Sequence, residues 1–280
     1  MKTHINADLH CHSTVSDGTL DPGVLAQRAF LQGVTLWSLT DHDELSGQTQ
    51  AQTAAQALGM DYCCGVEISV TWAGKTIHIV GLNFDPNTPV LVEGLASVRA
   101  GRVERAHKIA AELTKIGIAD TYQGALQYAA NPSLISRTHF ARHLVSSGAC
   151  RDVNDVFSRY LTPGYPGYIP HTWASLSQAV SWIRAAHGTA IIAHPGRYQL
   201  NEIEKHLLYE EFKALGGTGI EVITGSHRVD QYHEYTQVAL RYGFLASRGA
   251  DFHGPKESHV DLGCLPFLSE KLTPVWHAWA

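Results

Sequence analysis

The sequence predicts an α/β fold, a closed or nearly closed barrel of the TIM type interrupted by a helical insertion. Apolar strand-like runs alternate with helices of about 10–15 residues at both ends of the chain, as in parallel β-α units. The middle of the chain has helical patterns only. The length of 280 residues suits one barrel with an insertion. We therefore assign 1–100 and 168–280 to the barrel and 101–167 to the insertion.

In the first part of the chain, turn and cap residues separate the predicted elements. Asp21 and Pro22 are typical of a helix start, and Gly33 is typical of a helix end. The first strand is predicted to end in His10 and His12, and the pattern then predicts helix 22–30, strand 34–39, helix 46–58 and strand 62–68.

A β-hairpin is predicted next, with strands 66–72 and 75–82 around Ala73 and Gly74. With a two-residue turn, Glu67 lies diagonally from His78 on the same face, roughly 7–8 Å away. A three-residue turn would place these two side chains on opposite faces, so the prediction depends on the shorter turn.

The remaining elements follow from apolar periodicity and from Gly and Pro punctuation. The insertion is expected to contain helices 101–116, 122–130, 133–147 and 153–160, and to end in the loop 162–168, which is rich in Pro, Gly and Tyr. The barrel then continues with helix 175–187, strand 190–193, helix 201–215, strand 220–223, helix 229–242 and strand 245–247.

Composition narrows the class of protein. The net charge of −5 argues against a general nucleic-acid coat or an anionic membrane surface. No apolar run approaches the roughly 20 residues of a membrane span, and residues 1–4 lead into a strand without an apolar leader. Five cysteines without Cys-x-x-Cys spacing favour a reducing compartment. We expect a cytoplasmic protein with no membrane and no obligate protein partner.

Imidazoles and carboxylates gather where the predicted strands end. His10 and His12 are two apart on the first strand, so both side chains face the same way and can bind one ion. Because functional groups of parallel barrels collect at strand ends, we expect the other candidates to join them. These are Asp17, His42, Glu67, His78, His194, Asp251 and His253.

Nine candidate ligands are too many for one ion, because zinc takes about four ligands and magnesium about six. At least two divalent cations are therefore expected, and we predict three. Imidazole and carboxylate ligands without thiolate suit Mn²⁺, which we place first, and also Fe²⁺, Zn²⁺ or Mg²⁺.

This ordered set of residues resembles the polymerase-and-histidinol-phosphatase (PHP) family, whose fold is a distorted seven-stranded β/α barrel around three metal ions. The match spans the chain apart from the insertion. The opening run 8–18 and the helical insertion look most like the bacterial 3′,5′-nucleoside bisphosphate phosphatases. That group overlaps with small 5′→3′ exoribonucleases acting on short RNA.

The resemblance also implies how the ligands are shared. Glu67 would bridge two ions, and Asp41 would be a partner that fixes an imidazole tautomer or contacts the leaving group. The implied sets are His10, His12, Glu67 and Asp251 for the first ion, Glu67, His78 and His194 for the second, and Asp17, His42 and His253 for the third.

Clustered divalent ions activate water and neutralise phosphate oxygens, so hydrolysis of a phosphate ester by a metal-bridging hydroxide is expected. The leaving alkoxide needs a metal or a proton from His194 or His253, and the sequence does not choose between them. Arginine suits bidentate phosphate contact. Arg197 and Asp17, near the metals, are candidate substrate-binding residues. Arg137, together with Ser136 and His139, would hold a second phosphate.

The leading hypothesis is a phosphatase that converts 3′,5′-bisphosphonucleotides, such as adenosine 3′,5′-bisphosphate, into a nucleoside 5′-monophosphate and phosphate. A 5′→3′ exoribonuclease acting on short RNA is the close alternative, and a histidinol phosphate phosphatase is the third. An amidohydrolase is less favoured because no lysine lies at a predicted strand end. From another class, the chain could be a non-catalytic, metal-stabilised regulatory module.

Overall fold

The computed structural model describes residues 5–279, and its strands form two sheets. The smaller sheet is parallel with order β1-β2-β3, and the larger is mixed with order β6-β4-β5-β7-β8-β9. The expectation of a cytoplasmic location rests partly on residues 1–4, which lie outside the described residues. The strands are β1 (Ala7–Asp8), β2 (Leu36–Trp37), β3 (Asp61–Tyr62), β4 (Gly65–Trp72), β5 (Lys75–Leu82), β6 (Ala174–Ser175), β7 (Thr189–Ile192), β8 (Gly219–Thr224) and β9 (Leu245–Gly249).

Isolated backbone hydrogen bonds connect the two sheets on both sides. On one side the Leu9 N–H donates to the Arg248 carbonyl (3.0 Å), and on the other the Asp43 N–H donates to the Glu67 carbonyl (2.9 Å). The predicted α/β class is confirmed. However, the described strands form two sheets joined by isolated bridges, and not one continuous closed sheet. The reason is that β1 and β2 pair over only two residues before the chain enters loops with polar side chains.

Strands β4 and β5 form the predicted hairpin in the predicted register. Trp72 pairs with Lys75, and Ser69 pairs with His78. Glu67 and His78 therefore lie on one face, and their side chains meet at 2.7 Å between His78 Nδ1 and Glu67 Oε1. The hairpin thus places two candidate ligands by local pairing alone.

Helix α1 (Pro22–Leu31) begins and ends as the sequence indicates. The Asp21 carboxylate accepts a hydrogen bond from the Gly23 N–H (2.9 Å), and Pro22 occupies the first turn. Gly33 follows with φ 76°, a conformation that glycine adopts without strain.

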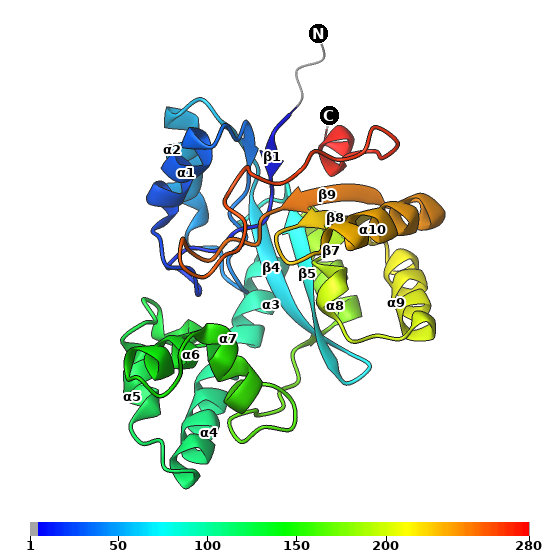
Figure 1. Cartoon of the computed structure of the whole chain (residues 1–280). Coiled ribbons are helices and arrows are strands. Elements are labelled where there is room, and N and C mark those ends of the chain that lie inside the picture. The colour runs from blue at the N-terminus through cyan, green and yellow to red at the C-terminus, as the bar shows by residue number, and fades with distance from the viewer. Residues whose placement is uncertain (1–4, 280) are drawn as a thin grey trace.

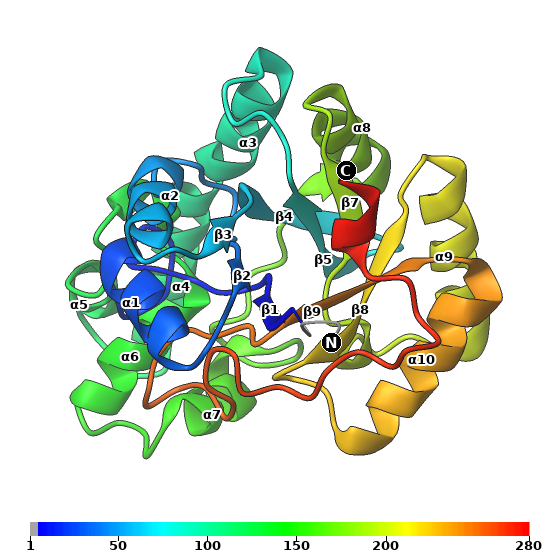
Figure 2. The same cartoon turned by 90° about the horizontal axis from the view of Figure 1, so that it is seen from above.

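The other barrel helices cover the strands from outside, as Figure 2 shows. Helix α3, strand β6 and the 3₁₀ turns Pro195–Arg197 and Val275–Ala278 were not predicted from the sequence. The remaining predicted helices lie within a few residues of their expected ranges. They are α2 (Gln48–Ala57), α8 (Leu176–Ala185), α9 (Glu202–Ala214) and α10 (Val229–Tyr242), and the unpredicted helix α3 spans Pro89–Ala100.

The insertion is helical, as expected, and lies to one side of the sheets (Figure 1). It has its own apolar core, in which Ile109, Leu113, Phe140 and Leu144 are buried. The predicted helix 133–147 is divided, because its first residues form a 3₁₀ turn, and the segment 153–160 contains a π-helical turn. The elements are α4 (Arg102–Lys115), α5 (Thr121–Leu126), Pro132–Leu134 (3₁₀), α6 (Arg137–Ser146), α7 (Val153–Val156) and Phe157–Leu161 (π).

A larger apolar core fills the space between the strands and the outer helices. Trp37, Ile68, Ile79 and Phe212 are fully buried in it. All five cysteines are free. Within the described residues, none of the helices is both long and apolar enough to cross a bilayer.

The hairpin turn provides a test of the fold. Ala73 and Gly74 have φ of 47° and 73°, as in a type I′ turn. Gly74→Ala should lower the free energy of unfolding by about 1–2 kcal/mol, because an L side chain is strained at positive φ. Ala73→Asn should raise it, because asparagine tolerates this conformation better than alanine. Urea denaturation of both variants measures the free energy of unfolding. A change of the same sign in the two variants would contradict the turn assignment.

Candidate metal centre and substrate cavity

The structure brings all nine candidate ligands together. They come from loops and strands at one end of the two sheets, and they contact one another in overlapping groups. Three groups have donor atoms within 4.8 Å of one another. The groups are His10, His12, Glu67 and Asp251; His12, Asp17, His42 and His253; and His42, Glu67 and His78.

The first group matches the set implied for the first ion. His10 Nε2 and His12 Nε2 lie 3.3 and 3.2 Å from Glu67 Oε2. Asp251 Oδ1 lies 3.6 Å from His10 Nε2 and 3.3 Å from His12 Nε2. Two imidazole nitrogens and two carboxylate oxygens therefore face one small space.

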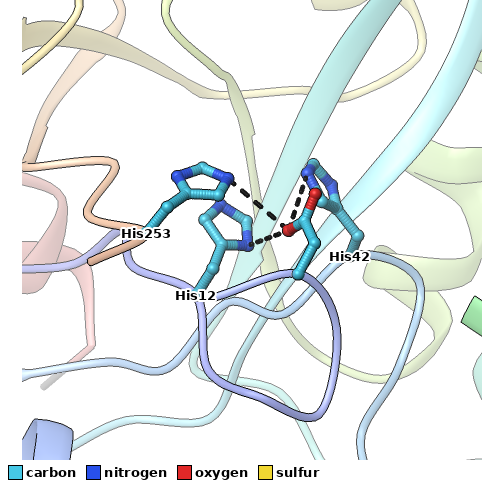
Figure 3. Close-up of side chains that lie close together, drawn as sticks. His12, His42 and His253 are labelled. Atoms are coloured by element: carbon cyan, nitrogen blue, oxygen red, sulfur yellow. Dashed lines mark ion pairs between the residues drawn. The ribbon is translucent and has the colours of Figure 1, made fainter. Parts of the chain in front are cut away.

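The second group surrounds Asp17, and Figure 3 shows its three imidazoles turned toward one carboxylate oxygen. Asp17 Oδ1 lies 3.5 Å from His253 Nε2, 3.8 Å from His42 Nε2 and 4.0 Å from His12 Nδ1. His12 therefore faces both groups, one with each ring nitrogen, whereas the expected third set did not include it.

Glu67 lies at the centre of the cluster. Its Oε1 atom is 2.7 Å from His78 Nδ1 and 2.7 Å from His194 Nε2, and its Oε2 atom is 3.0 Å from His42 Nδ1. The carboxylate thus contacts residues from all three groups, which is the geometry of a bridging ligand.

The donor atoms fit divalent cations. Within residues 5–279, several buried atoms of the cluster have no hydrogen-bond partner, although buried polar atoms in proteins almost always have one. A cation would satisfy these lone pairs, and imidazole with carboxylate suits Mn²⁺, Fe²⁺ and Zn²⁺. The atoms are His12 Nδ1, Asp17 Oδ1, His42 Nδ1, Glu67 Oε2, His194 Nδ1 and Asp251 Oδ1.

The electrostatics favour charged carboxylates. Burial alone would raise the pKa of Glu67, but His78, His42 and His10 outweigh burial and hold that pKa well below its usual range. Burial and the nearby Arg197 lower the pKa of His194 to about 3. The site therefore holds an ionised carboxylate beside an imidazole in its neutral, ligand-forming state.

His253 is also kept neutral. Burial and the proximity of His12 lower its pKa to about 4. Its Nδ1–H donates to the Asp251 carbonyl (3.0 Å), so Nε2 is the nitrogen that faces Asp17. This is the tautomer that a metal ligand requires.

Glu221, which the sequence analysis missed, orients two ligands. It accepts a hydrogen bond from His10 Nδ1 (2.7 Å) through Oε1 and from the His194 N–H (2.6 Å) through Oε2. The first contact leaves His10 Nε2 directed into the cluster. A carboxylate within the otherwise apolar, buried strand β8 was the available signal.

Asp41 has a different position from the one expected. It accepts hydrogen bonds from the Ser13 hydroxyl (2.6 Å) and the Ser16 hydroxyl (2.5 Å), and the hydrogen bonds of its side chain involve these serines and no imidazole. The role of tautomer-fixing partner, expected for Asp41, is occupied at His10 by Glu221. Asp41 instead holds the loop that carries Asp17.

The loop after His194 is strained and is held by His227, which precedes α10, and by Gln231 within α10. His194 has φ 25°, which is unusual for a residue other than glycine. Two residues on, the Gly196 N–H donates to His227 Nε2 (3.0 Å), and Gln231 Nε2 donates to the Gly196 carbonyl (3.2 Å). These contacts, also missed from the sequence, fix the segment between His194 and Arg197.

A cavity of about 130 Å³ lies beside the cluster and is lined by both barrel and insertion. Arg137 and Arg197 line it as expected, and Arg105 joins them without having been predicted. Arg197 is half exposed and pairs with Asp251 at 3.0 Å. Arg137 donates to the Leu161 carbonyl (3.0 Å), so its guanidinium keeps further N–H groups for an anion.

Ser136 and His139 were expected to accompany Arg137. Ser136 lines the cavity, and its hydroxyl lies 3.4 Å from Asp17 Oδ2. His139 is fully buried, and its Nδ1 accepts a hydrogen bond from the Ser136 N–H (3.0 Å). Its side chain therefore caps α6 from within the insertion and does not reach the cavity.

Comparisons with known proteins agree with this geometry. Residues 8–92 match the PHP domain model. The chain is 49% identical over 271 residues to the 3′,5′-nucleoside bisphosphate phosphatase of Chromobacterium violaceum, with 97% of this chain and 95% of the relative covered. It is 40% identical to the 5′-3′ exoribonuclease of Haemophilus influenzae, covering 96% and 97% of the two chains.

Solved structures give the same result. An amidohydrolase from Chromobacterium violaceum with bound sulfate and no metal superposes with a TM-score of 0.95 at 48% identity, covering 98% of this chain and 95% of that one. A protein described as a metal-dependent phosphoesterase from Bifidobacterium adolescentis superposes with a TM-score of 0.83 at 25% identity, covering 98% and 94%. From these relatives and from the ligand cluster, we conclude that this chain belongs to the PHP family.

Proposed function

We propose that this protein is a metal-dependent phosphatase that removes the 3′-phosphate of 3′,5′-bisphosphonucleotides, such as adenosine 3′,5′-bisphosphate, leaving a nucleoside 5′-monophosphate. The observation that carries the proposal is the buried cluster of unpartnered imidazole and carboxylate atoms beside a cavity lined by arginines. The 49% identity to a 3′,5′-nucleoside bisphosphate phosphatase supports the same choice of substrate.

The cluster would hold three divalent cations, with Mn²⁺ preferred and Fe²⁺, Zn²⁺ or Mg²⁺ as alternatives. Bound cations would lower the pKa of water and neutralise the phosphate oxygens. In this assignment Glu67 would be a ligand of two ions, and Glu221 orients His10. Proton donation to the leaving oxygen by His194 or His253 stays a prediction. The low pKa of both imidazoles favours the neutral form and does not support this role.

The insertion, residues 101–167, would recognise the substrate. Arg137 and Arg105 line the cavity, and neither forms an ion pair among the described residues. Burial lowers the pKa of Arg105 to about 9, which reflects a positive charge held in poorly hydrated surroundings. An anionic 5′-phosphate would compensate these guanidinium groups. Arg197 would contact the phosphate that is cleaved.

The barrel would comprise residues 1–100 and 168–280. We infer that its two sheets together form the distorted seven-stranded β/α barrel expected from the family, which the hydrogen bonds at both sheet edges support. The five free cysteines support a cytoplasmic location.

Exoribonuclease activity on short RNA is the second candidate, because the cavity continues beyond the cluster. A neighbouring pocket of about 520 Å³ shares Arg197, Asp251 and His253 with the first cavity and runs toward Asn154 and His259. Such a groove could hold further nucleotides. The 40% identity to an exoribonuclease points in the same direction. A non-catalytic module is less favoured, because every ligand of the cluster is in place.

The activity test compares phosphate release from adenosine 3′,5′-bisphosphate with nucleotide release from a short 5′-phosphorylated RNA, and includes histidinol phosphate. With Mn²⁺ the bisphosphate should be the best substrate, and chelation should abolish turnover. His10→Ala should lower kcat/KM by more than about 100-fold, since even outer-shell changes at metal sites cost 10–100-fold. His233→Ala, an exposed histidine of α10, is the matched control.

Two outcomes would overturn this assignment. No turnover of any phosphate ester with added Mn²⁺ would contradict the enzyme, and faster turnover of RNA than of the bisphosphate would favour the exoribonuclease. Circular dichroism of His10→Ala must match the unaltered protein, so that a loss of activity reports on the cluster.

Arg137 provides a test of substrate selection. For Arg137→Gln, the ratio of kcat/KM between adenosine 3′,5′-bisphosphate and adenosine 3′-monophosphate should fall roughly ten- to hundredfold, because charged hydrogen bonds contribute about 1.5–3 kcal/mol. Arg151→Gln, an exposed arginine of the same insertion, should leave the ratio unchanged. An unchanged kcat/KM ratio in Arg137→Gln would contradict a contact between Arg137 and the 5′-phosphate.

A further inference from the structure

A buried ion pair joins the insertion to the loop of a candidate ligand. Asp43, directly after His42, is fully buried and has φ 52°, a strained conformation for aspartate. Its carboxylate accepts hydrogen bonds from the Ser69 N–H (2.7 Å) and the Ser69 hydroxyl (2.9 Å). It also pairs with Arg102, the first residue of α4.

The two partners of Asp43 belong to different parts of the molecule. Ser69 lies on β4, two residues from Glu67 on the same face. Arg102 is buried at the start of the insertion, and its guanidinium packs over Trp173 at 4.7 Å. The conformation after His42 is therefore set jointly by the sheet and by the insertion.

The backbone around His42 has the same double attachment. The Asp43 N–H donates to the Glu67 carbonyl (2.9 Å), which fixes the loop on β4. Arg99 donates to the Asp43 carbonyl (2.5 Å) from the end of α3, the barrel helix that leads directly into the insertion. His42 has little freedom of its own, because both the carboxylate and the peptide group that follow it are held.

His42 is one of three ligands, with His12 and Glu67, that belong to two groups. Its Nε2 faces Asp17 at 3.8 Å, and its Nδ1 faces Glu67 at 3.0 Å. A small rotation of the 42–43 segment would therefore alter two cation positions together. Loss of Arg102 would leave the Asp43 charge buried without its partner, and such a change displaces or destabilises the segment that carries the charge.

We propose that Asp43 and Arg102 are positioning residues that couple docking of the insertion to cation binding at His42. Cation binding holds His42 and thereby favours the docked insertion, and undocking weakens cation binding by the same factor, as linkage requires. The inference rests on the metal centre of the proposed function and adds that the insertion helps to form it.

The test uses the full chain, freed of metal with a chelator and titrated with Mn²⁺ alone. Equilibrium dialysis with elemental analysis gives the number and affinity of bound ions, and hydrogen exchange of residues 102–115 reports on docking. In Arg102→Gln, the weakest Mn²⁺ should bind at least about tenfold less tightly, within the usual range of coupling. Mn²⁺ should also protect α4 less than in the unaltered chain.

Two further variants separate coupling from loss of structure. Arg102→Lys keeps the charge and should show an intermediate Mn²⁺ affinity, which serves as the test if Arg102→Gln does not fold. Lys108→Gln, on the same helix in an exposed pair with Glu104, should bind Mn²⁺ normally. Unaltered Mn²⁺ affinity in both Arg102 variants, whatever their stability, would overturn the coupling. Normal Mn²⁺ binding without phosphatase activity would instead overturn only the proposed function.

Discussion

The buried negative charge of Glu67 is the constraint on which the site depends. Taking a carboxylate out of water costs several kcal/mol unless positive charge and hydrogen bonds replace the solvent. Here imidazoles converge on both of its oxygens, with His78 and His194 each at 2.7 Å from Oε1. Two of the clustered imidazoles are held through their other ring nitrogen, His10 by Glu221 and His253 by the Asp251 carbonyl. Near these partners the strands β1 and β2 are short, and isolated bridges join the two sheets.

Much of the fold could be predicted because the signals are local. The helix at 229–242 was expected with the bounds that α10 has, since its apolar periodicity is regular and Gly243 follows it at φ 69°. Ala73 and Gly74 specify a two-residue turn, and this turn alone fixes which face Glu67 shares with His78. Most candidate ligands could be predicted for the same reason, because they lie in a recognisable strand or within a few residues of its end. Asp17 is further away, nine residues after the end of β1.

The parts that could not be predicted depend on long-range contacts. Asp41 and Glu221 are both buried carboxylates near the cluster, and nothing in their local sequence states which one faces an imidazole. Arg105 looks like an ordinary helix-surface arginine until the insertion folds against the cavity. His139 is only two residues from Arg137, yet the cap of α6 turns it inward. Residue propensity and spacing predict helices and strands, but they do not predict which side chains meet when these elements pack together.

The β4–β5 hairpin also bears on the order in which the site forms. Glu67 and His78 are 11 residues apart, so their contact needs only the closure of a short loop. In contrast, His10 and Glu221 are 211 residues apart, and Asp8 and Ala250 are 242 apart. During synthesis the central carboxylate can therefore meet its first imidazole long before the chain is finished. The complete set of candidate donors exists only after Asp251 and His253 have been made.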